Sequence, residues 1–167
     1  MVGAGSNSPP SPSQQPRTSL SMADLARWTF LVSSSIQIET NVVRLMIGYA
    51  RQEPQIECCG LLAGTAGRIT RAFPAENVAA NRATAYEIAT KQIVHLTREI
   101  RLASLELLGI YHSHPNGKSE PSETDISSAC YPDVAYFIVS PAPNAAAPAR
   151  AFSIRDGRVS ELELRAV

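Results

Sequence analysis

The stretch LELLGIYHSHPNGKSEPSETD, residues 105–125, decides the fold of this chain. Its first part, LELLGIYHSH, is apolar on both alternations, which predicts a central strand buried on both faces. Residues two apart on a strand point to the same side, so His112 and His114 project together at its end. A loop with two prolines and an Asn-Gly pair then leads to Ser122, where a helix is expected to begin.

This loop has two interpretations. In the first, His112 and His114 share a metal ion with Asp125, which falls in the first turn of the expected helix. That set of two imidazoles and one carboxylate leaves the fourth position to water, as in catalytic zinc sites. In the second, the histidines are solvated, and Ser122 and Asp125 are an S-x-x-D capping pair. The two readings overlap, but we expect that Asp125 cannot cap the helix and bind a metal fully at the same time.

A metal site of this kind needs a base to take a proton from water. Glu57 opens the apolar stretch IECCGLLAG, where an ionised side chain is costly unless it reaches solvent or a partner. Taken alone, Glu57 can be a strand-end residue in water. Beside an open metal site, it is the candidate general base.

Strands and helices interleave along the rest of the chain without an internal repeat. Thr40 and Thr90 are expected to cap two long helices, of which the first stops at Pro54. The remaining elements are an extended entry at residues 30–40, a hairpin at 56–77 turned at GTAG, a short strand at 86–90, a buried strand at 134–141 and a terminal hairpin at 150–164 turned at Asp156 and Gly157. This order predicts an α/β or α+β fold with a mixed sheet sandwiched between helices.

The composition predicts one globular domain. The chain has 167 residues, 44% of them hydrophobic and 18% charged, which is enough for a sizeable core. Residues 1–21 are almost all Gly, Ser, Pro, Gln and Asn, a composition that predicts a disordered tail. We therefore expect a tail at 1–21 and a single domain at 22–167, with Met22 as an alternative start.

Charge and cysteine content exclude several classes of protein. Fifteen basic residues balance fifteen acidic ones and form no long block, so neither a nucleic acid partner nor a membrane anchor is expected. No apolar run approaches the roughly 20 residues of a membrane span, and none fits a signal peptide, which favours a cytoplasmic protein. Cys58, Cys59 and Cys130 show no disulfide or C-x-x-C pattern and are expected to be buried structural residues.

The residues singled out above together resemble the JAMM or MPN+ metalloprotease family. Its signature is a glutamate on an early strand, followed by H-x-H, seven residues and S-x-x-D. All five positions are filled, by Glu57, His112, His114, Ser122 and Asp125, and the spacer is PNGKSEP. The pair Cys59-Gly60 also matches the E-x-C-G strand of the family. The resemblance covers about residues 36 to 165 and implies an MPN/JAB-like fold with a curved, mixed sheet.

The resemblance implies that His112, His114 and Asp125 bind one zinc ion, with Glu57 as acid and base. Ser122 would help to hold the oxyanion. The resemblance also implies hydrolysis of a peptide or isopeptide bond, without a covalent intermediate, after the C-terminal Gly-Gly of a ubiquitin-like protein. The stretch YEIAT, residues 86–90, is the expected groove strand, which binds the substrate tail by edge addition.

Eukaryotic deubiquitinases of the family carry insertions in certain regions, and the length of those regions in this chain indicates its expected substrate. These regions are short here, so the chain looks more like the compact bacterial and archaeal members. Such members act on ubiquitin-like sulfur-carrier proteins or their conjugates.

Three other readings are open. A non-catalytic MPN-type scaffold that binds a ubiquitin-like partner has the same fold, but such chains usually lack signature residues. Metal-dependent hydrolases on (β/α)8 barrels also use H-x-H, but they need roughly 250 residues. A non-haem iron oxygenase uses two histidines and a carboxylate, but it leaves Glu57 and the S-x-x-D helix without a role. The third histidine, His95, is expected to be solvated or partly buried.

Overall fold

The computed structural model describes residues 34–167 of the chain. The tail expected at residues 1–21 lies outside the described residues, as does the beginning of the extended entry. No helix in the described part has the length and apolar character that crossing a membrane requires.

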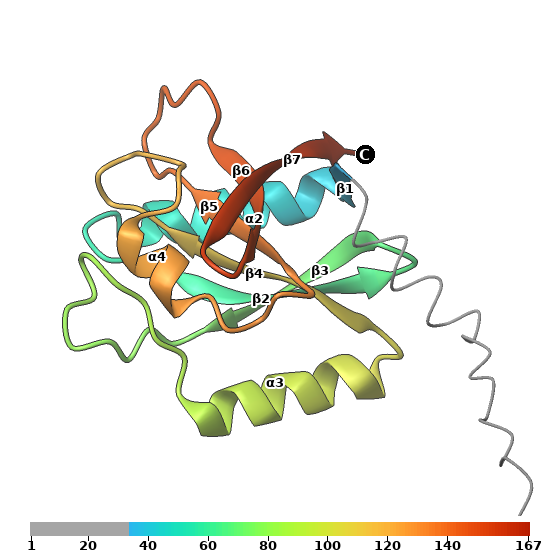
Figure 1. The fold of residues 1–167 in the computed structure, drawn as a ribbon. Coiled ribbons are helices and arrows are strands. Elements are labelled where there is room, and N and C mark those ends of the chain that lie inside the picture. Colours follow the sequence, from blue (N-terminus) through green and yellow to red (C-terminus); the bar gives the residue numbers. More distant parts are fainter. Residues whose placement is uncertain (1–33) are drawn as a thin grey trace, which may run out of the picture.

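Residues 34–167 form seven strands and three helices that interleave along the chain (Figure 1). In order, they are β1 (Ser35–Ile38), α2 (Thr40–Gln52), β2 (Cys59–Thr65), β3 (Arg68–Ala75), α3 (Thr90–Leu102), β4 (Glu106–Ser113), α4 (Glu123–Ser128), β5 (Ala135–Val139), β6 (Ala149–Arg155) and β7 (Arg158–Ala166).

The strands make one closed, mixed sheet in the order β1-β3-β2-β4-β5-β6-β7, in which β1 pairs with both β3 and β7. The pairs β1/β3, β1/β7 and β4/β5 are parallel, and the other pairs are antiparallel. The mixed sheet expected from the sequence is therefore confirmed.

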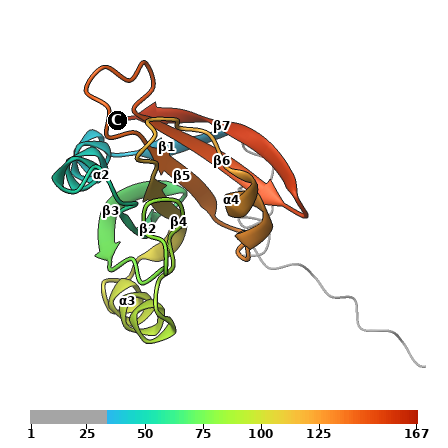
Figure 2. The same ribbon diagram turned by 90° about the vertical axis from the view of Figure 1, so that its left-hand side faces the viewer.

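The central strands are buried on both faces because a helix covers each side. Helix α2 packs on one core, which contains Met46 and Tyr111, and α3 packs on the other, which contains Ile100 and Ile110. Neighbours along β4, such as Ile110 and Tyr111, thus belong to different cores, as the alternation of a strand requires. Figures 1 and 2 show α2 and α3 on opposite sides of the sheet. The prediction of a sheet between helices, with residues 105–114 at its centre, is confirmed.

Both predicted hairpins are present. The β2–β3 turn is made by Ala66 and Gly67 and the β6–β7 turn by Asp156 and Gly157, all four with positive φ. Two consecutive residues with positive φ match the twist of antiparallel strands joined by a two-residue loop. Of the glycines in GTAG, only Gly67 lies in the turn. Gly64 ends up inside β2, where a Cβ atom would clash with the backbone of Arg68.

The two predicted threonine caps are wrong by one residue. Glu39 and Ala89 are the N-caps of α2 and α3, and neither helix has a side-chain cap. Thr40 is the first residue of α2, and its hydroxyl donates to the carbonyl oxygen of Val167 at 3.1 Å. A tertiary contact with the chain end therefore uses the group that the sequence assigns to capping.

Two further expectations are corrected. Residues 86–90 do not form a strand, because only Ile88 makes an isolated bridge, to Asn77, before α3 begins. The Asn77 side chain binds the backbone on both sides of Tyr86 and replaces part of a strand ladder. Among the three free cysteines, Cys59 is buried and Cys58 half-buried, but Cys130 is exposed after the short helix α4.

Candidate metal centre

Three separate segments bring the predicted site residues together at one end of the sheet. Strand β4 carries His112, and His114 follows directly after its end. Strand β2 pairs with β4 so that Cys59 lies opposite His112, which places Glu57, just before β2, beside the histidines. Helix α4 begins after Ser122 and carries Asp125 in its first turn. Figure 1 shows α4 at this end of the sheet.

The closest atoms of this cluster lie at the spacing of ligands around one metal ion. The Nε2 atoms of His112 and His114 are 3.1 Å apart. Oδ1 of Asp125 lies 3.1 Å from Nε2 of His112, and Oδ2 lies 3.1 Å from Nε2 of His114. Ligands held about 2.0 to 2.1 Å from a tetrahedral zinc ion are roughly 3.3 Å from one another. The three side chains therefore fit a shared cation with only a small outward movement.

A hydrogen bond at Nδ1, the nitrogen that does not face the cluster, sets the tautomer of His114. Nδ1 of His114 lies 3.1 Å from the carbonyl oxygen of Lys118. A carbonyl only accepts hydrogen bonds, so Nδ1 carries the proton and Nε2 keeps its lone pair for a metal. The Lys118 carbonyl was not identified from the sequence, because a backbone acceptor in a loop has no residue-type signal.

Asp125 caps helix α4 and faces both histidines at the same time. Its Oδ2 accepts hydrogen bonds from the backbone N–H and the hydroxyl of Ser122, both at 2.7 Å, and its own N–H donates to that hydroxyl oxygen at 3.2 Å. Its Oδ1 is directed to His112. In this arrangement the carboxylate caps the helix through Oδ2 while both of its oxygens face the imidazoles.

The charges in the cluster are strongly coupled. Burial alone raises the pKa of Asp125, but hydrogen bonds with His112 and His114 outweigh it and hold that pKa well below its usual range. Burial lowers the pKa of His112. Burial also lowers the pKa of His114, but its hydrogen bond and charge interaction with Asp125 outweigh burial, so that this pKa is raised.

Glu57 lies close to both histidines. Its side chain is only 4% exposed, and its ligand atom and those of His112 and His114 all lie within 4.8 Å of one another. Burial raises the pKa of Glu57 to about 7; nearby Asp125 also raises it, while His114 lowers it. Its Oε2 is buried and has no hydrogen-bond partner among the described residues. A carboxylate with this pKa and a free oxygen suits a proton acceptor working near neutral pH.

The loop at residues 77–88 holds Glu57 in place through the main chain. The N–H of Glu57 donates to the carbonyl of Arg82 at 2.7 Å, and its carbonyl accepts from the side chain of Asn77 at 2.9 Å. Asn77 is buried and was not identified from the sequence. The only local signal was that an asparagine after a strand often makes an Asx turn, as Asn77 does with the N–H of Ala79.

Packing explains the glycine at position 60, the last residue of the E-x-C-G match. A Cβ atom at this position would clash with the carbonyl oxygen of Phe73 and with the ring of Tyr111. Glycine thus allows β2 to lie between β3 and β4 close to the Tyr111 ring, in the register that carries Glu57 to the histidines.

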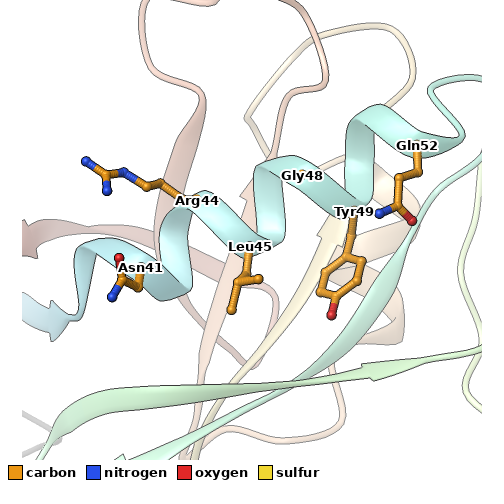
Figure 3. A pocket seen from close by; sticks show the side chains of 6 residues that line it. All are labelled: Asn41, Arg44, Leu45, Gly48, Tyr49 and Gln52. Atoms are coloured by element: carbon orange, nitrogen blue, oxygen red, sulfur yellow. The ribbon is translucent and has the colours of Figure 1, made fainter.

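Two features elsewhere do not contribute to this centre. A shallow pocket on the outer face of α2 is lined by Asn41, Arg44, Leu45, Gly48, Tyr49 and Gln52 (Figure 3). It contains none of the predicted site residues and no acid–base pair. His95 is exposed on α3 beside Glu99, as expected for a solvated histidine.

Comparison with known proteins finds a matching family model and related sequences. Residues 39–155 match the family model described as prokaryotic homologs of the JAB domain. The chain is 35% identical to the desampylase of Haloferax volcanii over 117 residues, which cover 66% of this chain and 84% of that protein. It is 33% identical to the CysO-cysteine peptidase of Mycobacterium tuberculosis over 126 residues, 74% of this chain and 86% of that protein.

The fold is also that of a solved JAB1/MPN domain. The crystal structure of the protein AF2198 from Archaeoglobus fulgidus aligns with a TM-score of 0.52 and 19% identity, over 78% of this chain and 99% of that one. At this identity the match concerns the fold alone, and it agrees with the mixed sheet and flanking helices described above.

Proposed function

The chain belongs to the prokaryotic JAB/JAMM domain family of metalloproteases, and on that premise we propose that it is a zinc-dependent peptidase. Its substrate would be the bond after the C-terminal Gly-Gly of a ubiquitin-like or sulfur-carrier protein. The observation that carries the proposal is the cluster of His112, His114 and Asp125. The two Nε2 atoms lie 3.1 Å apart, and each lies 3.1 Å from a different carboxylate oxygen of Asp125. Beside them is Oε2 of Glu57, which has no hydrogen-bond partner among the described residues.

His112 and His114 would hold one zinc ion through Nε2, together with the carboxylate of Asp125. The donor set suits the metal, because two neutral imidazoles and one carboxylate with an open fourth position are common at catalytic zinc sites. A bound zinc ion supplies Lewis-acid chemistry, namely a lower pKa for water and polarisation of a carbonyl oxygen. The described residues offer the buried negative charge that such an ion needs, in Asp125.

Glu57 would move the proton. Its free Oε2 accepts a proton from the attacking water and later returns it to the leaving amine, which completes hydrolysis without a covalent intermediate. The backbone contacts with Arg82 and Asn77 fix the main chain of Glu57, so that the carboxylate stays beside the histidines.

Ser122 would stabilise the oxyanion of the tetrahedral intermediate. Its hydroxyl donates to Oδ2 of Asp125 in this structure, and the residue is exposed. Its single proton can serve only one acceptor, so this role requires the hydroxyl to turn from Asp125 toward the substrate.

The segment at residues 85–88 would bind the substrate tail. Hydrogen bonds occupy the N–H and C=O of Glu87, which pair with Asn77 and Val78. In an extended segment, the backbone N–H and C=O groups of the adjacent residues point to the opposite edge. In the described part of the chain, the backbone N–H groups of Tyr86 and Ile88 have no hydrogen-bond partner. They offer a free edge beside His112, to which an extended Gly-Gly tail can pair.

A proline at Ile88 tests this edge. The Ile88→Pro substitution removes one N–H that would bind a tail carbonyl, and a hydrogen bond of about 0.5 to 1.5 kcal/mol corresponds to a roughly 3- to 10-fold rise in KM. Ile88→Ala is the matched control, since it loses the same packing but keeps the N–H. Steady-state kinetics should show the higher KM only for the proline variant. Equal KM values for the two variants would remove this segment from the docking site.

The activity itself is tested with a ubiquitin-like protein that carries a C-terminal extension after Gly-Gly. One arm uses a linear fusion and the other a lysine isopeptide conjugate. We expect release of the protein ending in Gly-Gly. Chelation should abolish the cleavage, and added zinc should restore it. Mass spectrometry of the products measures the cleavage in each case. Cleavage that survives chelation, or no cleavage in either arm, contradicts the proposal. The names of the two relatives, a desampylase and a CysO-cysteine peptidase, support this choice of substrate.

A further inference from the structure

The two histidines of the metal centre differ in what holds their rings. The Nδ1 atom of His114 is paired with the carbonyl of Lys118. The Nδ1 atom of His112 is buried and has no hydrogen-bond partner among the described residues, although the side chain is only 1% exposed. Metal-binding histidines usually have a partner on the second nitrogen that fixes the ring. Among the described residues, no hydrogen bond at Nδ1 therefore fixes the His112 ring.

The ring of Tyr86 lies directly on the ring of His112. Their centroids are 4.4 Å apart, and the planes differ by 20°, which is a stacked arrangement. His114 lies on another side, with its centroid 4.9 Å away and tilted by 58°. Turning the His112 ring about its Cβ–Cγ bond would drive its edge into the face of Tyr86. Stacking thus limits the same rotation that a hydrogen bond at Nδ1 would limit.

The position of Tyr86 is itself fixed on both sides. The side chain of Asn77 donates to the carbonyl oxygen of Ala85 at 3.0 Å and accepts from the N–H of Glu87 at 3.1 Å. These two residues flank Tyr86 directly. The same Asn77 side chain donates to the carbonyl of Glu57, so it ties the backbone on both sides of Tyr86 to the backbone of a cluster residue.

We infer that Tyr86 is a positioning residue for His112, whose stacked ring orients the imidazole for zinc as the Lys118 carbonyl orients His114. The phenol hydroxyl has no part in this role, which belongs to the ring. The inference rests on the zinc site of the proposed function, but it does not depend on the identity of the substrate.

The test compares zinc affinity in two variants by competition with a chromophoric chelator. Tyr86→Leu removes the ring and should weaken zinc binding about 10-fold, the lower end of the loss seen when the outer partner of a metal ligand is removed. Tyr86→Phe keeps the ring and should bind zinc like the wild type. Tyr131→Leu, at a tyrosine that is 43% exposed, is the control and should also bind like the wild type. Thermal unfolding of the metal-free proteins checks that each variant folds.

A spectroscopic measurement adds a readout that does not require activity. The ring current of a stacked tyrosine should move the His112 ring-proton resonances upfield of those of the exposed His95. This shift should persist in Tyr86→Phe and disappear in Tyr86→Leu.

Several results would overturn the inference. A folded Tyr86→Leu variant with wild-type zinc affinity, or a Tyr86→Phe variant as weak as Tyr86→Leu, excludes ring stacking as the cause. If Tyr86→Leu does not fold, the wild-type spectrum decides, and resonances without an upfield shift reject the stacking. A wild-type protein that binds no zinc refutes the metal site itself and this inference with it, whereas a zinc-binding protein without peptidase activity refutes only the proposed reaction.

Discussion

Substituting Glu57 with glutamine is expected to lower kcat by about 100- to 10 000-fold while leaving zinc bound, because general acid–base catalysis contributes that range. Glutamine has nearly the same shape as glutamate, but its side chain cannot take a proton from water near neutral pH. Two features assign this role to Glu57: its Oε2 is buried with no hydrogen-bond partner among residues 34–167, and burial raises its pKa to about 7. Metal analysis of the purified variant and kinetics with the fusion substrate measure the two effects separately.

The control for this variant is Glu53→Gln. Glu53 is exposed just after α2, four positions before Glu57, so this change removes the same charge outside the cluster. It should leave both kcat and the zinc content unchanged. Full activity of the Glu57→Gln variant would contradict the proposed role of Glu57 in proton transfer. Loss of zinc from this variant would indicate that Glu57 is a zinc ligand.

Asp125→Asn is expected to weaken zinc binding by more than about 100-fold, beyond the roughly 10- to 100-fold cost of losing an outer partner. The carboxylate uses both oxygens, with Oδ1 toward His112 and Oδ2 toward His114 and the N–H of Ser122. An amide places N–H donors at one of these positions and removes the negative charge. Chelator competition measures the affinity, and activity should fall with the zinc content.

Glu123→Gln is the matched control for Asp125→Asn. Glu123 lies in the same first turn of α4 and is exposed, so its loss removes the same favourable charge at the helix start without touching the histidines. It should bind zinc like the wild type. Because Glu57 is also close to both histidines, normal zinc affinity in Asp125→Asn together with loss in Glu57→Gln would exchange the roles of the two carboxylates.

Local sequence patterns predicted the elements that depend on neighbouring residues. Two-residue alternation placed His112 and His114 on one side of a strand end, and their rings do lie side by side. The turn at Asp156 and Gly157 and the S-x-x-D capping box at Ser122 are also correct. These features are set within a few residues by side-chain direction, φ preference and local hydrogen bonds, so the sequence contains the information that decides them.

The same local rules failed where a distant segment competes for a group. Thr40 does not cap α2, because its hydroxyl binds the carbonyl of Val167. Residues 86–90 are not a strand, because Asn77 takes the hydrogen bonds of the backbone around Tyr86. In both cases the partner lies elsewhere in the chain, and residue type alone does not reveal it.

By itself, the sequence determined that two histidines share the end of a strand, and it predicted the residues proposed here for zinc chemistry. Only the tertiary structure decided how they meet. The register of β2 against β4 places Glu57 beside His112, and α4 turns Asp125 so that one carboxylate caps the helix and faces both imidazoles. Tyr86 reaches His112 in the same way, through a loop held by Asn77. These distances depend on strand pairing and packing between segments far apart in the chain, and local conformational preferences do not specify such contacts.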